Sequence, residues 1–101
     1  MMTLTLSDIL DDLRAAEEGM HKFERRYWIS SAQFYELYSQ GLLDDGENAE
    51  DFAEWAGHHK LWQKRRAALE QISKERIETL HRQAGTATVR LTPAEPALKM
   101  G

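Results

Sequence analysis

The sequence predicts an all-α fold of two shorter helices and one long C-terminal helix, followed by an extended or disordered tail. Apolar residues recur every three or four positions from residue 9 to residue 27 and again from residue 52 to residue 80. This is the period of one face of an α-helix. Gly41 and the Asp-Asp-Gly turn at residues 44–46 separate the helical segments, and no proline interrupts residues 49–84. These observations favour helices throughout the ordered part of the chain.

We expect the first helix to begin at Ser7, a residue type that caps helices, and to run to about Tyr27. Its acidic residues lie near its start and its basic residues near its end, as the helix dipole favours. Gly19 inside this helix costs about 1 kcal/mol relative to alanine. A close crossing by another helix would account for it, and simple tolerance of the glycine is the equal alternative.

The second helix is expected to be short. Ser30 and Gln33 have the spacing of a capping box at its start, and Gly41 has the residue type that commonly follows a helix end. After the acidic turn, Asn48 is expected to cap the third helix.

The third helix is expected to run from Ala49 to about Ala84, which is about 54 Å at 1.5 Å per residue. A compact domain of this size has a radius of gyration of only about 13 Å, so part of the helix should project or pair with another chain. Gly85 should end it. We therefore expect a helical domain at residues 1–85 and a tail at residues 86–101 that is flexible until a partner orders it.

Composition narrows the classes of function. The chain has 101 residues and no cysteine, so disulfides, cysteine-ligated zinc and thiolate nucleophiles are absent. No apolar run approaches the roughly 20 residues of a membrane span, the mean hydropathy is -0.63, and no signal peptide is evident, so we expect a soluble cytoplasmic protein without membrane contact. Residues 1–58 hold 13 acidic and 4 basic side chains, whereas residues 59–84 hold 3 acidic and 7 basic. This overall acidic balance makes nucleic-acid binding by the chain alone an unfavoured reading.

Aromatic residues supply candidates for the core and for a binding surface. We expect Phe34, Phe52, Trp55 and Trp62 to form the core, because their spacing is helical and aromatics dominate small cores. Three others are expected to be at least partly exposed and to contact a partner, since tyrosine and tryptophan are enriched at interfaces: Trp28, Tyr35 and Tyr38. An ordinary surface role for these three is an equal alternative.

Two further segments are candidate partner-binding elements. The acidic turn, with Asp44 and Asp45, could cover a basic groove on a partner; the simpler reading is a solvated turn that places favourable charge at a helix start. Residues 86–91 alternate polar and apolar side chains over a strand length before Pro93. There Val89 and Leu91 could add a strand to the edge of a partner's sheet.

Catalysis and metal binding are not expected. Asp51, Glu54 and His58 share a helix face, but they lack the His-Glu-x-x-His order of a zinc protease, so a chance arrangement is favoured. No serine or threonine is identifiably paired with His21 or His81. Glutamates interrupt the basic run between residues 60 and 82, which favours a solvated helix face. We therefore expect no enzyme activity and no cofactor.

Residues 26–66 carry a resemblance to a known family. The motif S-S-A-Q-F-Y-E-L-Y-S-Q-G-L-L-D-D, followed by E-D-F-A-E-W-A, is similar to that of small prokaryotic helical proteins resembling antitoxins of toxin–antitoxin modules. The family pattern has a tyrosine-glycine pair, two serines, a phenylalanine-tyrosine pair, a Gly-x-Leu turn with aspartates, and Asp-Phe-x-Glu-Trp opening a long helix. This chain departs from it at Trp28, where a glycine is common, and in the extra residues 46–50.

The resemblance implies a protein that binds a cognate toxin-like protein encoded beside it and blocks its active surface, with no catalytic residues of its own. The alternative is a helical scaffold or adaptor that self-associates, as a homo-oligomer, through residues 59–84 of the long helix.

Overall fold

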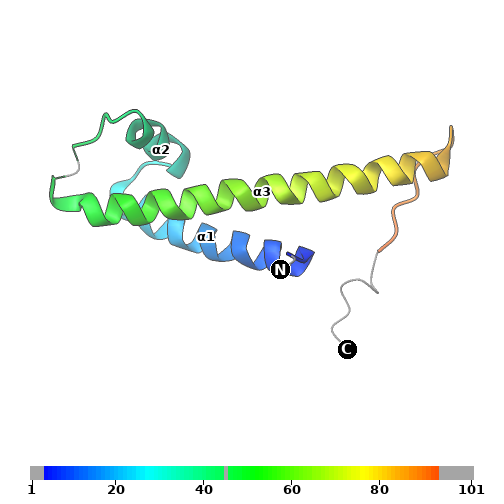
Figure 1. Ribbon diagram of the computed structural model, residues 1–101, viewed down its shortest axis with the longest axis horizontal. Helices are drawn as coiled ribbons and strands as arrows, with labels where there is room; N and C mark the ends of the chain where they lie inside the picture. The colour runs from blue at the N-terminus through cyan, green and yellow to red at the C-terminus, as the bar shows by residue number, and fades with distance from the viewer. Residues whose placement is uncertain (1–3, 45, 94–101) are drawn as a thin grey trace.

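The computed structural model describes residues 4–44 and 46–93, and within these ranges every regular element is a helix (Figure 1). The elements are α1 (Leu6–Tyr27), α2 (Ser31–Ser39), a single 3₁₀ turn η1 (Gly46–Asn48) and α3 (Ala49–Ala84). The all-α class, with two shorter helices, one long helix and a non-helical segment after it, is confirmed. None of the helices in the described ranges combines the length and the apolar character that a membrane crossing needs.

Helix α1 begins one residue before the predicted position, and its cap is not Ser7. The side chain of Thr5 accepts a hydrogen bond from the Asp8 amide, and the Asp8 carboxylate accepts one from the Thr5 amide, both at 3.1 Å. This reciprocal pair needs an acid or amide three residues after the cap. Thr5 has Asp8 at that distance, whereas Ser7 has Leu10.

The other predicted helix ends are close to the observed ones. Ser30 caps α2 by accepting from the Gln33 amide at 3.1 Å, and Gly41 follows with a φ of +70°. Gly85 ends α3 with a φ of +63°. Asn48 does precede α3, but its side chain makes no capping hydrogen bond, because the 3₁₀ turn η1 leads the chain directly into the helix.

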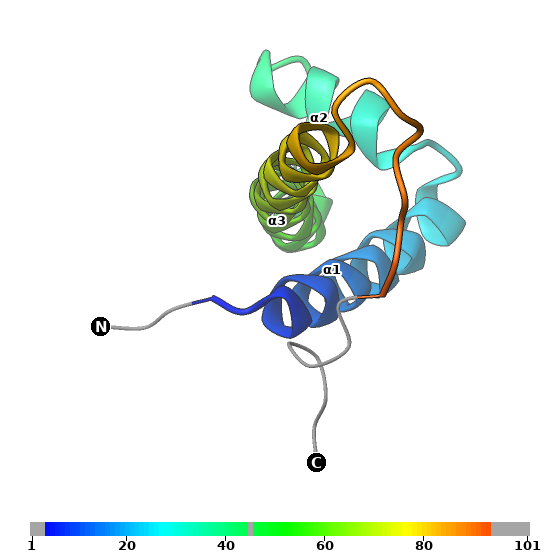
Figure 2. The same cartoon turned by 90° about the vertical axis from the view of Figure 1, so that its right-hand side faces the viewer.

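The core forms where α1 and α2 lie against neighbouring sides of α3 (Figure 2). Helices α1 and α3 are antiparallel, as Lys22 near the end of α1 bonds Glu54 near the start of α3, and Asp12 bonds Arg65 further along. The buried cluster between the three helices is mainly aromatic: Met20, Phe23, Phe34, Phe52, Trp55 and Ala56. The predicted core positions Phe34, Phe52 and Trp55 are buried, while Trp62 is half-buried at the margin.

Gly19 marks the close approach of α1 and α3. A Cβ atom added there would lie 2.5 Å from ring atoms of His58 on α3. The crossing that a glycine inside a helix predicts is therefore present, and it brings the His58 ring over the backbone of α1.

Helix α3 extends well beyond α1, as its length predicts (Figure 1). The molecule is 57 Å along its longest axis, and in the projecting part of α3 the side chains of Ile72 and Ile77 are 38% and 49% exposed. Residues 86–91 are neither helix nor strand in the chain alone, and the strand that they could add to a partner's sheet stays a prediction. The described segment after Gly85 turns back beside the helix, where the Arg76 guanidinium donates to the Thr92 carbonyl at 2.5 Å.

Candidate partner-binding surface

Trp28 stands at the corner between α1 and α2 and is the most exposed large apolar residue of the described chain. Its side chain is 84% exposed, and its backbone is left-handed, with φ 64° and ψ 30°. The backbone N–H donates to the Glu24 carbonyl at 2.8 Å and closes the end of α1. Glycine adopts this conformation at no steric cost, whereas other L-residues pay about 1–2 kcal/mol. This explains why glycine suits position 28 and shows that tryptophan here is unfavourable for the isolated fold.

The other two predicted aromatic contacts are half-buried. The Tyr38 ring stacks on Phe34 with centroids 5.4 Å apart, and the Tyr35 ring lies 4.9 Å from that of His59. Both tyrosines pack against the buried cluster. Each therefore supports the core with one side and presents only its remaining surface to solvent.

The acidic turn is exposed where the structure describes it. The Asp44 carboxylate accepts from the Gly46 amide at 3.2 Å, and Asp45 lies outside the described residues. Further along, Glu54 bonds Lys22 at 2.9 Å, and this hydrogen bond lowers the pKa of the Glu54 carboxyl. Asp51 accepts from the Tyr27 hydroxyl at 2.6 Å. Asp51 and Glu54 thus join α3 to α1, whereas the turn and Glu50 in the first turn of α3 are exposed.

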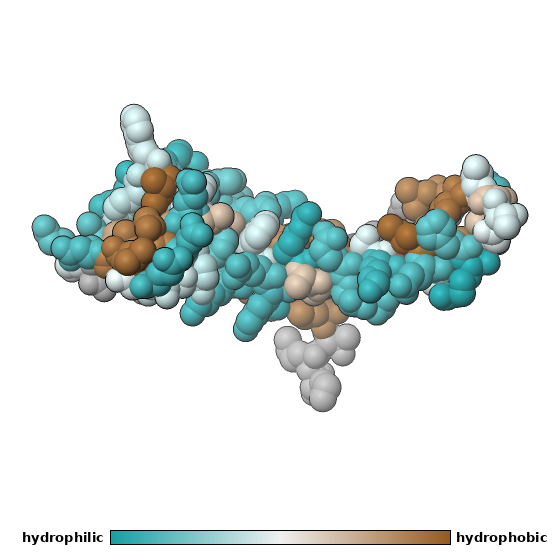
Figure 3. Space-filling view, turned by 90° about the horizontal axis from the view of Figure 1, so that it is seen from above, coloured by the Kyte–Doolittle hydropathy of each residue, from teal (hydrophilic) through white to brown (hydrophobic). Residues whose placement is uncertain are grey.

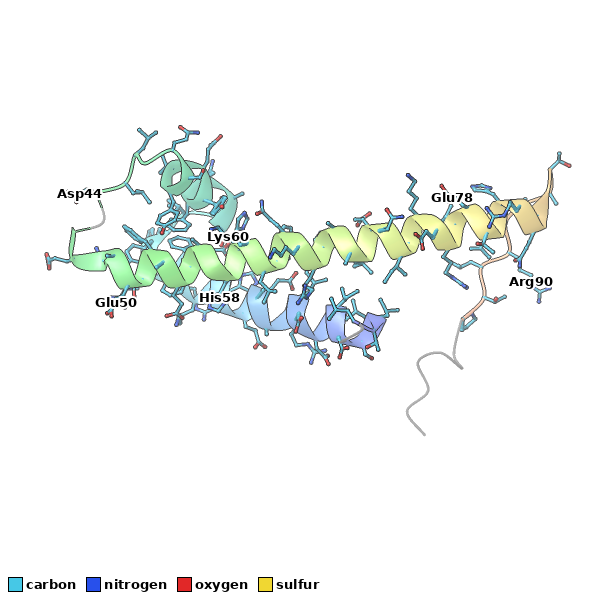
Figure 4. The ribbon with its side chains drawn as sticks, viewed as in Figure 1. Asp44, Glu50, His58, Lys60, Glu78 and Arg90 are labelled. Atoms are coloured by element: carbon cyan, nitrogen blue, oxygen red, sulfur yellow. The ribbon has the colours of Figure 1, made fainter. Side chains whose placement is uncertain are left out.

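The structure separates the predicted contact residues into two groups at opposite ends of the long axis. Asp44 and Arg90, labelled in Figure 4, mark these ends. Trp28, Tyr35 and Tyr38 belong to the α2 end, whereas Val89, 39% exposed, and Leu91, 76% exposed, follow the far end of α3. In Figure 3 apolar side chains gather at both ends, over the connection from α2 to α3 and over the last turns of α3 with the segment that follows.

A hollow of about 230 Å³ opens beside the α1–α2 corner. Residues of all three helices and the corner itself line it: Met20, Glu24, Ser30, Ser31, Ala32, His59 and Trp62. We call it the corner hollow.

Ser31 of α2, which lines the corner hollow, connects all three helices through hydrogen bonds. Its hydroxyl accepts from the buried Trp55 indole at 2.8 Å and donates to the Glu24 carboxylate at 2.8 Å, and its amide donates to the same carboxylate oxygen at 2.9 Å. The His21 ring donates to the other Glu24 oxygen at 2.8 Å. Burial acts to raise the pKa of the Glu24 carboxyl, but the hydrogen bonds from His21 and Ser31 outweigh it, so the pKa lies below its ordinary value.

His59 is the polar residue of the corner hollow that the fold leaves unpaired. Its side chain is buried, with 6% of the residue exposed, and its Nδ1 atom is sealed from solvent without a hydrogen-bond partner. Burial lowers the pKa of the imidazole, which keeps the ring neutral. Its ring lies between those of Tyr35 and Trp62, with centroids 4.9 and 6.0 Å away.

The sequence did not indicate the corner hollow. Ser31 follows the capping residue, Glu24 lies among charged neighbours on a helix, and His59 sits beside His58 in a segment that suggested at most a chance metal face. No group of three or more metal-ligating side chains lies close enough together among residues 4–44 and 46–93. The hydroxyl of Ser31 donates to Glu24, and none of the hydrogen bonds of this hydroxyl in the described residues involves a histidine.

Comparison of the chain with protein-family models, with curated proteins and with solved structures gives no match.

Proposed function

We propose that this protein is a non-catalytic binding module that neutralises a toxin-like protein by forming a direct complex with it. The observation that carries the proposal is the exposed indole of Trp28, held on a left-handed backbone. A residue that costs the isolated fold stability and exposes a large apolar ring is best explained by a contact made outside the chain.

The surroundings of Trp28 support this reading. Tryptophan is among the commonest hot-spot residues, and a backbone already closed by a capping hydrogen bond loses little further freedom on binding. Residues 1–58 carry most of the negative charge of the chain, which would steer this end toward a basic surface. Toxins that act on nucleic acid need such a surface, because they must bind phosphates.

The far end of α3 supports a second contact. Val89 and Leu91 are exposed beside the projecting helix. Together with Trp28 they would allow the protein to contact a partner at two separate sites. Removal of residues 86–101 tests this step. We expect weaker binding to the partner, and equal binding by the truncated chain would remove Val89 and Leu91 from the interface.

A self-associating scaffold or adaptor is the second candidate function. The observation that favours it is the exposure of Ile72 and Ile77 on the part of α3 that projects past α1. Two such helices could pair and cover one or the other of these side chains, which lie about 140° apart around the helix. Light scattering on the chain alone distinguishes the two candidate functions. A dimer that resists salt, and that the double substitution Ile72→Ser with Ile77→Ser converts to monomer, favours the scaffold.

The decisive experiment is to express the tagged chain with and without the protein encoded next to it. We expect co-purification in high salt and rescue of growth. In the same assay Trp28→Ala should abolish both, while Leu10→Ala, which trims another exposed apolar side chain on α1, should leave both unchanged. Absence of a complex and of rescue with the unaltered chain would reject the neutralising function.

A further inference from the structure

The corner hollow has the features of a site that receives an aromatic side chain. Its walls include the apolar parts of Met20, Ala32 and Trp62, and the His59 ring continues an aromatic series from Tyr35 to Trp62. Aromatic rings pack favourably against such rings in offset and tilted geometries.

His59 offers the corner hollow one polar atom. Its side chain is buried, and Nδ1 is sealed from solvent without a hydrogen-bond partner, so a guest cannot reach that atom. Nε2 is therefore the ring nitrogen left to contact a guest in the hollow.

The charges of the hollow define the guest further. Glu24 contributes a carboxylate whose side chain is 29% exposed, so an anion would be repelled and a hydrogen-bond donor favoured. The apolar walls disfavour a fully charged group, which would lose its hydration. An indole meets these requirements because it is neutral, aromatic and carries one N–H. Inside the fold, Trp55 and Trp62 already donate to a hydroxyl and to a carboxylate, at 2.8 and 3.0 Å.

The chain itself supplies an exposed indole close in sequence to the residues of the hollow. Trp28 lies two residues before Ser30 of the hollow's rim, and with 84% of its surface exposed it cannot fill the hollow of its own chain. In a two-fold symmetric contact each copy can place a projecting side chain in a recess of the other, since both copies offer both features. We propose that the corner hollow binds Trp28 of a second copy of this chain, reciprocally, so that two indoles occupy two hollows.

Such a contact is small. Two tryptophans and their recesses bury less than the roughly 1,000 Å² expected of a stable interface, so the dimer should be weak and concentration-dependent. The contact covers Trp28 until a tighter partner competes for it. The inference does not rest on the proposed function, because the purified chain alone is tested.

Sedimentation velocity on the full chain from about 10 µM to about 1 mM, the range expected for an interface this small, tests the proposal. The unaltered chain should change from monomer to dimer across this range. Trp28→Ala removes the projection and Ala32→Phe fills the recess from an exposed position, so each variant alone should stay monomeric. Ala67→Phe, on an exposed position of α3 that does not line the hollow, is the matched control and should dimerise normally.

Circular dichroism checks that each variant is folded. The proposal is overturned if the unaltered chain stays monomeric at about 1 mM or if dimers persist in both variants. A monomeric chain whose Ala32→Phe variant loses a co-purifying toxin-like protein would assign the hollow to that partner instead, and would leave the proposed function standing.

Discussion

Replacing Trp28 by glycine and by alanine measures the backbone strain at the α1–α2 corner. About five-sixths of the tryptophan surface is exposed, so either substitution loses little packing. If a tryptophan side chain offers about 250 Å², the covered part is roughly 40 Å², or about 1 kcal/mol at ~25 cal/mol per Å².

The two substitutions then differ through the backbone alone. Alanine keeps the left-handed penalty of roughly 1–2 kcal/mol, whereas glycine relieves it. Glycine gives back about 0.4–1 kcal/mol because it makes the unfolded chain more flexible. We therefore expect Trp28→Ala to lower the free energy of unfolding by about 1 kcal/mol, and Trp28→Gly to stay within about 1 kcal/mol of the unaltered protein and above the alanine variant.

Urea unfolding followed by far-ultraviolet circular dichroism is the suitable assay, since tryptophan fluorescence changes with the substitution itself. Ala15→Gly, at an exposed position inside α1, provides the control, where the order of the two residues should be reversed with a loss of about 1 kcal/mol. If alanine proved more stable than glycine at position 28 as well, that residue would not have a left-handed backbone, and the strain that motivates the binding proposal would be absent.

Three further substitutions test the packing of the core and the corner hollow. Gly19→Ala places a Cβ against the outer ring atoms of His58, and the cost of moving that ring should offset the gain of about 1 kcal/mol in helix propensity. In a His58→Ala background the same change should stabilise the fold by up to about 1 kcal/mol, and thermal melts of the four chains check this difference; equal effects in both backgrounds would contradict the contact. Ser31→Ala leaves the buried Trp55 indole N–H without its acceptor and should cost about 1–3 kcal/mol in urea unfolding, so a loss below about 0.5 kcal/mol would contradict the hydrogen bond. Burial lowers the pKa of His59, so near pH 6.5 the unfolded chain takes up a proton that the folded chain resists. The stability that this residue contributes is therefore present above that pH and is lost below it, by at most about 1.4 kcal/mol per pH unit. Between about pH 7.5 and about pH 5.5, the His59→Leu variant should lose less unfolding free energy than the unaltered protein.

Local chemistry explains which boundaries were predictable. Gly41 and Gly85 end helices through backbone conformations that glycine adopts freely, and Ser30 caps α2 through atoms only three residues away. Such interactions need no knowledge of the rest of the fold. The start of α1 was placed wrongly because Ser7 and Thr5 are both capping types, and only the reciprocal bond with Asp8 distinguishes them.

The surface was harder to predict because exposure depends on neighbours that are distant in sequence. Tyr35 and Tyr38 have the residue type of interface aromatics, yet both pack against the buried cluster between the helices. Tyr35 lies against the ring of His59 from α3, and Tyr38 stacks on Phe34 one turn earlier in α2, which α3 buries. Residues 86–91 alternate like a strand, but a strand requires a neighbouring strand, and within the described part of the chain none is available. Whether these residues pair with a partner's sheet therefore stays a prediction.

Helical period, glycine placement and the absence of proline were sufficient to establish three helices, their approximate ends and a third helix too long for its domain, because each depends on interactions within a few residues. Three features arise only when α1, α2 and α3 pack together. They are the corner hollow, the unpaired His59, and the separation of Trp28 from Leu91 by the length of α3. Burial and cavities depend on contacts between residues of different helices, which lie far apart in the sequence, so local patterns in the sequence do not reveal them.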